Sequence, residues 1–176
     1  MKCDVGARND IRQRYLTLAN GRRIIGIAWK SGAGRTGSGR SLALSDLAPF
    51  SQIKNVFFVN LQYGDVSGDL ARLTNDHGVD VYQDPMIDQM KDMDAFAAQI
   101  AAMDMVVSAA NTNVHVAGGL GVPTKVLIPG TADWRWITDR DVSYWYPSVR
   151  LHRKSDNQNI DRYIMKISDC INSDIN

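Results

Sequence analysis

The sequence predicts a Rossmann-like α/β domain, a three-layer sandwich in which helices cover both faces of a parallel sheet. Short apolar runs alternate along the whole chain with segments in which apolar residues recur at helical spacing. The apolar runs are continuous, which is typical of strands that are buried on both faces of a parallel sheet. The 176 residues are enough for one such domain.

The predicted elements alternate in order along the chain. The predicted strands are 23–29, 56–62, 79–84, 105–110, 125–129 and 148–153. The predicted helices are 8–19, a short one near 45–50 with Ser45 as N-cap, 67–78 closed by Gly78, 92–103, about 113–120, and 159–171. We therefore divide the chain into a linker helix within residues 1–22 and a single Rossmann-like domain, residues 23–176.

Composition and charge exclude several classes of protein. Apolar residues make up 44% of the chain and charged residues 22%, and the formal net charge of +1 gives no basis for a nucleic-acid or membrane-binding surface. Cys3 and Cys170 have no metal-ligand spacing. The first 20 residues are too polar for a signal peptide, and no apolar run approaches the ~18 residues of a membrane span. We expect a cytoplasmic protein without a membrane span or a nucleic-acid partner.

The loop "KSGAGRTGSGRS", residues 30–41, contains two phosphate-binding patterns. Gly32, Gly34 and Gly37 form G-x-G-x-x-G, and a phosphate-loop pattern starts at Gly34 with Arg40 in the place of lysine. Both patterns need glycines directly between a strand and a long helix. Here Trp29, Lys30 and Ser31 come between the apolar part of the strand and the glycines, and the segment that follows is short and interrupted by proline. We favour a glycine-rich loop with neither function. A dinucleotide or triphosphate loop, or ligand contact by another geometry, remains open.

The segment "SAANTNVHVAGGLGVP", residues 108–123, places small polar residues where a buried strand meets a helix. Ligands of open parallel sheets bind at the carboxyl ends of the strands. Asn111, Thr112 and Asn113 lie at such an end, where the free N–H groups of the helix favour an anion. His115 follows Asn111 by four residues, so both occupy one face of the helix and the imidazole points back toward that anion.

Two interpretations of this segment are open. Asn111 or Thr112 could serve only as an N-cap, with His115 as a hydrogen-bonded packing residue. Alternatively, Lys30, which ends the first strand, could point to the same edge of the sheet and bind a diphosphate together with the helix N-terminus. A lysine in this position is otherwise a solvated surface residue.

The segments "IAAMDMVVSAANTNVHVAGG", "LGVPTKVLIPGTADWRW" and "DVSYWYPSVRLHR" resemble the C-terminal half of GT-B glycosyltransferases. They are most similar to bacterial tetratricopeptide-associated proteins related to heptosyltransferases and O-GlcNAc-transferase-like enzymes. The resemblance covers the chain from about residue 23 onward. It implies one half of a GT-B fold, which binds a nucleotide-sugar donor without a metal ion. An N-terminal half-domain of the same protein would supply the acceptor site, and this chain alone would transfer nothing.

The resemblance also implies which residues bind the nucleotide sugar. By this resemblance, the diphosphate lies against the segment 111–115, and Lys30 helps to neutralise its charge. Leu61-Gln62 and the segment before the helix that starts at 92–94 border the nucleotide cleft. The implied binding residues are Lys30, Gln62, Asn111, Thr112, Asn113 and His115. No catalytic residue follows from it.

The chain departs from the family pattern at two positions. Many relatives have Asp or Ser where this chain has Ala110, and the common "LQKG" is "LQYG" here, with Tyr63 in the place of a basic residue. Two rival hypotheses therefore stay open: a kinase or dehydrogenase that uses the loop 32–41, and a non-catalytic interaction domain that kept the fold.

A cluster of aromatic residues follows the last apolar strands of the pattern. Its members are Trp134, Trp136, Tyr144, Trp145 and Tyr146, interleaved with arginines. We favour packing or interdomain contact for this cluster. Contact with the acceptor or the sugar, and stacking on single-stranded nucleic acid, are the alternatives.

Overall fold

The computed structural model describes residues 1–32, 40–130, 134–136 and 140–175. Within these ranges, six strands form one sheet in the order β3-β2-β1-β4-β5-β6, and all neighbouring strands are parallel. The strands are β1 (Arg23–Ala28), β2 (Val56–Asn60), β3 (Val81–Tyr82), β4 (Met105–Ala109), β5 (Thr124–Ile128) and β6 (Val149–Arg153). This is the strand order of a Rossmann fold, and the predicted fold class is confirmed.

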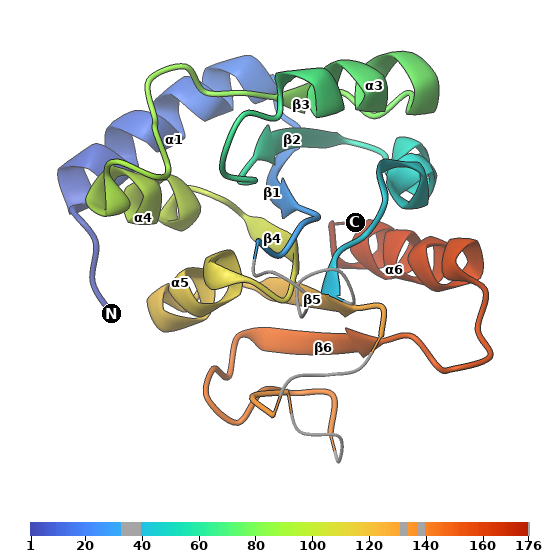
Figure 1. The fold of residues 1–176 in the computed structure, drawn as a ribbon. Helices are drawn as coiled ribbons and strands as arrows, with labels where there is room; N and C mark the ends of the chain where they lie inside the picture. The colour runs from blue at the N-terminus through green and yellow to red at the C-terminus, as the bar shows by residue number, and fades with distance from the viewer. Residues whose placement is uncertain (33–39, 131–133, 137–139, 176) are drawn as a thin grey trace.

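Helices cover both faces of the sheet, as Figure 1 shows. One face packs against α1 (Val5–Ala19), α4 (Met93–Ala101) and α5 (Thr112–Leu120). The other face packs against the 3-10 helix η2 (Leu44–Gln52), α3 (Ser67–His77) and α6 (Ile160–Ile175). Across the described part of the chain, no helix combines the length and the apolar character that crossing a membrane requires.

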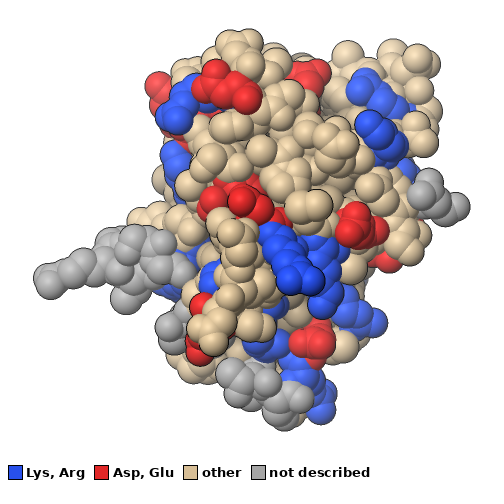
Figure 2. Space-filling model, turned by 90° about the vertical axis from the view of Figure 1, so that its right-hand side faces the viewer, with Lys and Arg blue, Asp and Glu red and all other residues tan. Residues whose placement is uncertain are grey.

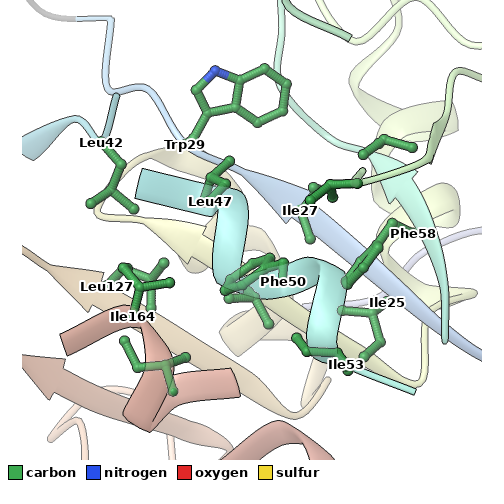
Figure 3. Close-up of a cluster of buried hydrophobic side chains, with 14 of the residues drawn as sticks. Ile25, Ile27, Trp29, Leu42, Leu47, Phe50, Ile53, Phe58, Leu127 and Ile164 are labelled. Carbon is green, nitrogen blue, oxygen red and sulfur yellow. The ribbon is translucent and has the colours of Figure 1, made fainter. Parts of the chain in front are cut away.

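The sheet has a buried core on each face, which explains why the apolar runs are continuous. Figure 3 shows the core under η2 and α6. Ile25 and Ile27 of β1 belong to this core, where the rings of Phe50 and Phe58 stack with their centroids 5.9 Å apart. Ile24 of the same strand belongs to the core on the opposite face, under α1 and α4. Because successive side chains of a strand point to opposite faces, a strand that is covered on both sides has no polar face.

Helix α1 is packed into the domain. It begins directly after Asp4, whose carboxylate accepts a hydrogen bond from the N–H of the first turn, so the helix starts earlier than the predicted residue 8. The fully buried Tyr15 donates a hydrogen bond to Asp84 (2.7 Å), and Arg14 pairs with the same carboxylate (2.6 Å). These bonds fix α1 to the loop that follows β3. That residues 1–22 link this domain to another one stays a prediction.

The segment after the glycine-rich loop is η2, a short 3-10 helix. The prediction of Ser45 as its N-cap is wrong: the helix follows Ala43, and Asp46 accepts a hydrogen bond from the N–H of Ala43 (2.8 Å). Pro49 lies inside η2, and its missing N–H does not permit a long α-helix. The glycine patterns fall largely on residues 33–39, which lie outside the described residues, so the alternatives for this loop are not decided by the fold.

His152 lies half-buried on strand β6, at one edge of the sheet. Burial, followed by the positive charge of Lys125 on the neighbouring strand β5, lowers the pKa of His152 from 6.5 to about 4. The folded protein therefore keeps this imidazole neutral well into the acid range.

We expect the stability of the protein to fall between pH 6.5 and pH 4. A histidine of the unfolded chain has a pKa near 6.5, so in this window the unfolded state binds a proton that the folded state does not. By linkage, His152 lowers the free energy of unfolding by about 3 kcal/mol at pH 4. Urea denaturation at pH 7, 5 and 4 measures the loss. The variant His152→Gln should flatten the pH dependence and His77→Gln should not; equal slopes in both would contradict the assignment.

Candidate functional site

The candidate site lies where the strand order reverses, between β1 and β4. Connections that leave these two strands turn to opposite faces of the sheet, which opens a crevice at their carboxyl ends. A cavity of about 550 Å³ occupies this place. The residues that line it follow four different strands: Ser31, Gly32, Arg40, Tyr63, Ala110, Asn111, Thr112, His115, Arg135 and Trp136.

Asn111 ties the two central strands together at the cavity. Its Oδ1 caps α5 by accepting a hydrogen bond from the N–H of Asn113 (3.0 Å), and the Ser108 hydroxyl donates to the same oxygen (3.1 Å). Its Nδ2 donates to the carbonyl of Lys30 (3.0 Å). The N-cap role weighed for Asn111 is confirmed, and its amide also holds the end of β1 against the end of β4.

Asn113 has a structural role and does not line the cavity. Its side chain is fully buried, and Nδ2 donates a hydrogen bond to the carbonyl of Leu61 (2.9 Å), the residue after β2. Within the described residues its Oδ1 has no hydrogen-bond partner. Asn113 thus fixes the start of α5 to the end of β2, while Thr112 beside it is exposed and faces the cavity.

Gln62 fastens the end of β2 to the end of β1. Its Oε1 accepts hydrogen bonds from the N–H groups of Trp29 (3.1 Å) and Lys30 (2.7 Å). The Asn60 side chain in turn bonds the backbone of Gln62, accepting from its N–H (2.9 Å) and donating to its carbonyl (2.9 Å). Gln62 lines a neighbouring cavity of about 520 Å³ beside the loop 83–90, and not the cavity of the candidate site.

Lys30 does not line the cavity either. Its ammonium group forms an ion pair with Asp69 in the first turn of α3, and 48% of its side chain is exposed. The cations that do line the cavity are Arg40 and Arg135. A diphosphate site that includes Lys30 therefore requires Lys30 to change partners, and its role in binding stays a prediction.

His115 lies on the wall of the cavity within a set of aromatic rings. Its imidazole stacks on Trp136, with centroids 5.4 Å apart and the planes at 16°, and Nδ1 lies 3.2 Å from the hydroxyl of Tyr146. Gly118, one turn further along α5, leaves room for the Tyr146 ring, because an added Cβ would lie 2.5 Å from its Cγ. The ring orientation of His115 is thus set from two sides.

The described residues that line the cavity include two cations and no carboxylate. The cations are Arg40 and Arg135, and the N-terminus of α5 borders the same space. Tyr63 also lines the cavity, and its hydroxyl accepts a hydrogen bond from the N–H of Gly32 (2.6 Å). Such a site suits an anion that is bound through charge-assisted hydrogen bonds.

Among the residues that the structure describes, no three His, Cys, Asp or Glu side chains converge on a possible metal position.

The aromatic cluster divides into a buried and an exposed part. Trp136 is buried against the cavity, in agreement with the packing interpretation, whereas Trp134, Tyr144 and Trp145 are largely exposed. Arg135 and Trp136 were missing from the predicted site. Their presence in an aromatic and arginine-rich segment was the available signal, but no local pattern places that segment opposite α5.

The chain is 35% identical over 127 residues to Protein FlbA from Caulobacter vibrioides, an alignment that covers 72% of this chain and 21% of that protein. The chain thus spans about a fifth of the length of this relative. No protein-family model matches the sequence.

Solved structures of glycosyltransferases share the fold. E. coli ADP-heptose lps heptosyltransferase II matches with a TM-score of 0.64 and 13% identity, over 99% of this chain and 53% of that chain. The glycosyl transferase family 9 structure from Veillonella parvula DSM 2008 matches with a TM-score of 0.60 and 10% identity, again over 99% of this chain and 53% of that chain. The domain therefore has a glycosyltransferase-like Rossmann fold, and it spans about half the length of these enzymes.

We expect Asn111→Ala to destabilise the protein by about 2–3 kcal/mol. The variant loses the α5 cap, which contributes roughly 1 kcal/mol, and leaves the carbonyl of Lys30 without its partner. Urea denaturation measures the change. Asn159→Ala is the matched control, because Asn159 caps α6 through the N–H groups of Asp161 and Arg162 but joins no strands. Equal losses in the two variants would contradict the strand-joining role of Asn111.

We expect Gly118→Ala to displace Tyr146 and to change the environment of His115. An alanine at this point of a helix is normally favourable, but here its Cβ overlaps the tyrosine ring. Gly119→Ala in the same helix is the control, since its Cβ would lie 3.2 Å from the flexible Met1 side chain. Histidine NMR spectra should show the His115 signal shifted in Gly118→Ala only. An unshifted signal would show that Tyr146 does not hold the imidazole.

Proposed function

We propose that this chain is the nucleotide-sugar-binding domain of a glycosyltransferase. The observation that carries the proposal is the cavity between the carboxyl ends of β1 and β4, bordered by the N-terminus of α5 and by two arginines. In Rossmann folds this crevice receives the phosphates of nucleotides. The glycosyltransferase-like fold and the similarity to about half of a heptosyltransferase chain support the same assignment.

The proposed chemistry is displacement of a nucleoside diphosphate from a sugar. Negative charge grows on the leaving diphosphate as the bond to the sugar breaks, and donors that already point at this position stabilise the transition state. The α5 N-terminus, Thr112, Arg40 and Arg135 would supply these donors without a metal ion. His115, held by Trp136 and Tyr146, would contact the diphosphate or the sugar.

Three amide side chains would act indirectly in this scheme. Asn111, Asn113 and Gln62 fix the ends of β1, β2 and β4 against α5, so that the cavity exists before a ligand binds. We assign them as positioning residues. A second half-domain of a longer protein would bring the acceptor and the base that activates it, so the separate chain would bind nucleotide and transfer no sugar.

One observation favours a second candidate, a binding domain without catalysis. Ala110 lines the cavity where many relatives have Asp or Ser, and Lys30 is paired with Asp69 rather than directed at the cavity. A domain of this kind would keep the fold for contact with other proteins. Nucleotide binding by the chain separates the two candidates.

We expect calorimetric titration to show that one of UDP, ADP and GDP binds without magnesium, and that NAD and magnesium-ATP bind more weakly. Charge-assisted hydrogen bonds contribute about 1.5–3 kcal/mol each, so Arg135→Gln or Arg40→Gln should weaken binding roughly tenfold or more. The nucleotide affinities of the variants His115→Ala and Lys30→Ala are measured in the same titrations.

The matched control is Arg72→Gln, which removes an exposed arginine of α3 whose ion pair among the described residues is with Asp76 of its own helix. This variant should bind the nucleotide with the same affinity as the unchanged chain. Binding of NAD or magnesium-ATP alone, with no effect at Arg135 or His115, would refute the proposal and point to the loop 32–41. No binding of any nucleotide would favour the non-catalytic candidate.

A further inference from the structure

A second groove, separate from the candidate site, lies between β6 and α6. Its volume is about 550 Å³, and it shares no lining residue with the cavity at β1 and β4. Lys125 of β5 and Arg150 of β6 are register partners on its floor, and His152 lies two residues further along β6. Lys166 and Asp174 of α6, eight residues apart on one side of the helix, form its wall.

The described residues around this groove carry an excess of positive charge. The lining contains four cationic side chains and two carboxylates, which leaves two positive charges unbalanced. Lys125 is buried and pairs with Asp174 (2.6 Å), and Arg153 pairs with Asp141 (3.3 Å). Figure 2, which views the molecule from the side of α6, shows Lys and Arg side chains gathered on this part of the surface.

Arg150 and Lys166 are the two charges left over. Both are exposed, and within the described residues neither forms an ion pair. Arg150 lies on the floor of the groove, on β6, and Lys166 lies on its wall, on α6. Like charges that face the same space repel one another unless an anion lies between them, so the arrangement fits a bound dianion.

His152 adds a neutral hydrogen-bonding group to the floor. Its Nε2 is buried and has no hydrogen-bond partner in the part of the chain that is described. The groups facing it are Lys125 on β5, Lys166 and Asp174 on α6, and Asp141 before β6; burial and the two lysines keep the pKa of the imidazole low. At neutral pH the imidazole therefore lines the groove without adding charge.

We propose that the groove between β6 and α6 binds a phosphate dianion, held by Arg150 and Lys166 beside His152 and the Lys125–Asp174 ion pair. A phosphate monoester carries close to two negative charges at neutral pH, which matches the two unbalanced cations. The groove is larger than a phosphate ion and within the range of small-molecule sites, so it accommodates the organic part of a phosphorylated ligand. This proposal is independent of nucleotide binding at the first cavity.

The three histidines of the chain report on three different places. His152 lies in the groove, His115 at the first cavity and His77 at the end of α3. Inorganic phosphate, and then glycerol 3-phosphate, is titrated into the protein at pH 7.5 and constant ionic strength, with chloride as the reference anion. Histidine NMR spectra are recorded at each step. Saturable movement of the His152 signal is expected, with the His77 signal unchanged.

The double variant Arg150→Gln/Lys166→Gln should weaken this binding at least tenfold. Arg162→Gln is the matched control, because it removes an exposed cation of α6 that does not line the groove. Movement of the His115 signal alone would place phosphate at the first cavity and overturn the proposal. So would a His152 shift that is equal in both variants, or the absence of any saturable shift.

A second arm of the experiment distinguishes a soluble phosphate ester from a lipid headgroup. Sedimentation with phosphatidylcholine vesicles that contain phosphatidic acid is compared between the unchanged chain and the double variant. Cosedimentation that the double variant loses would assign the groove to a phospholipid headgroup. Saturable binding of glycerol 3-phosphate without cosedimentation would assign it to a soluble phosphorylated ligand.

Discussion

The hydrogen bond from the Asn111 amide to the carbonyl of Lys30 is the interaction on which the candidate site depends. It joins β1 and β4, the two strands from which the connections leave in opposite directions. Without a tie at this point, the ends of the strands would be free to separate where the crevice opens. The oxygen of the same amide accepts a hydrogen bond from the N–H of Asn113 in the first turn of α5. One side chain therefore sets both the position of the helix N-terminus and the spacing of the strands.

Gln62 and Asn113 extend this arrangement to β2. Each of the three amides bonds a backbone group that would otherwise be buried without a partner, at a cost of about 1–3 kcal/mol per group. These hydrogen bonds hold the ends of β1, β2 and β4 against α5. The charge of the cavity comes from Arg40 and Arg135, which follow β1 and β5 and lie in the loops. Scaffold and charge are thus supplied by different segments of the chain.

The sequence was sufficient for the fold class and for the start of α5, because both follow from local patterns. Continuous apolar runs predicted the parallel sheet, and polar residues after a strand predicted the start of α5. The partners of those residues depend on tertiary contacts between distant segments. Asn113 bonds Leu61 across 52 positions and Lys30 pairs with Asp69 across 39, and no spacing in the sequence encodes either contact. For the same reason Arg135 and Trp136 could not be assigned to the site in advance.

The Lys30–Asp69 ion pair is compatible with the role that the family resemblance implies for Lys30. An ion pair between exposed side chains contributes under about 1 kcal/mol, and almost half of the Lys30 side chain is exposed. A phosphate near the end of β1 offers the ammonium group a stronger, charge-assisted partner, so exchanging Asp69 for a ligand costs little. Arg40 and Arg135 already line the cavity. Lys30 would then add to an anion site that the arginines and α5 form on their own, and its removal should matter less than theirs.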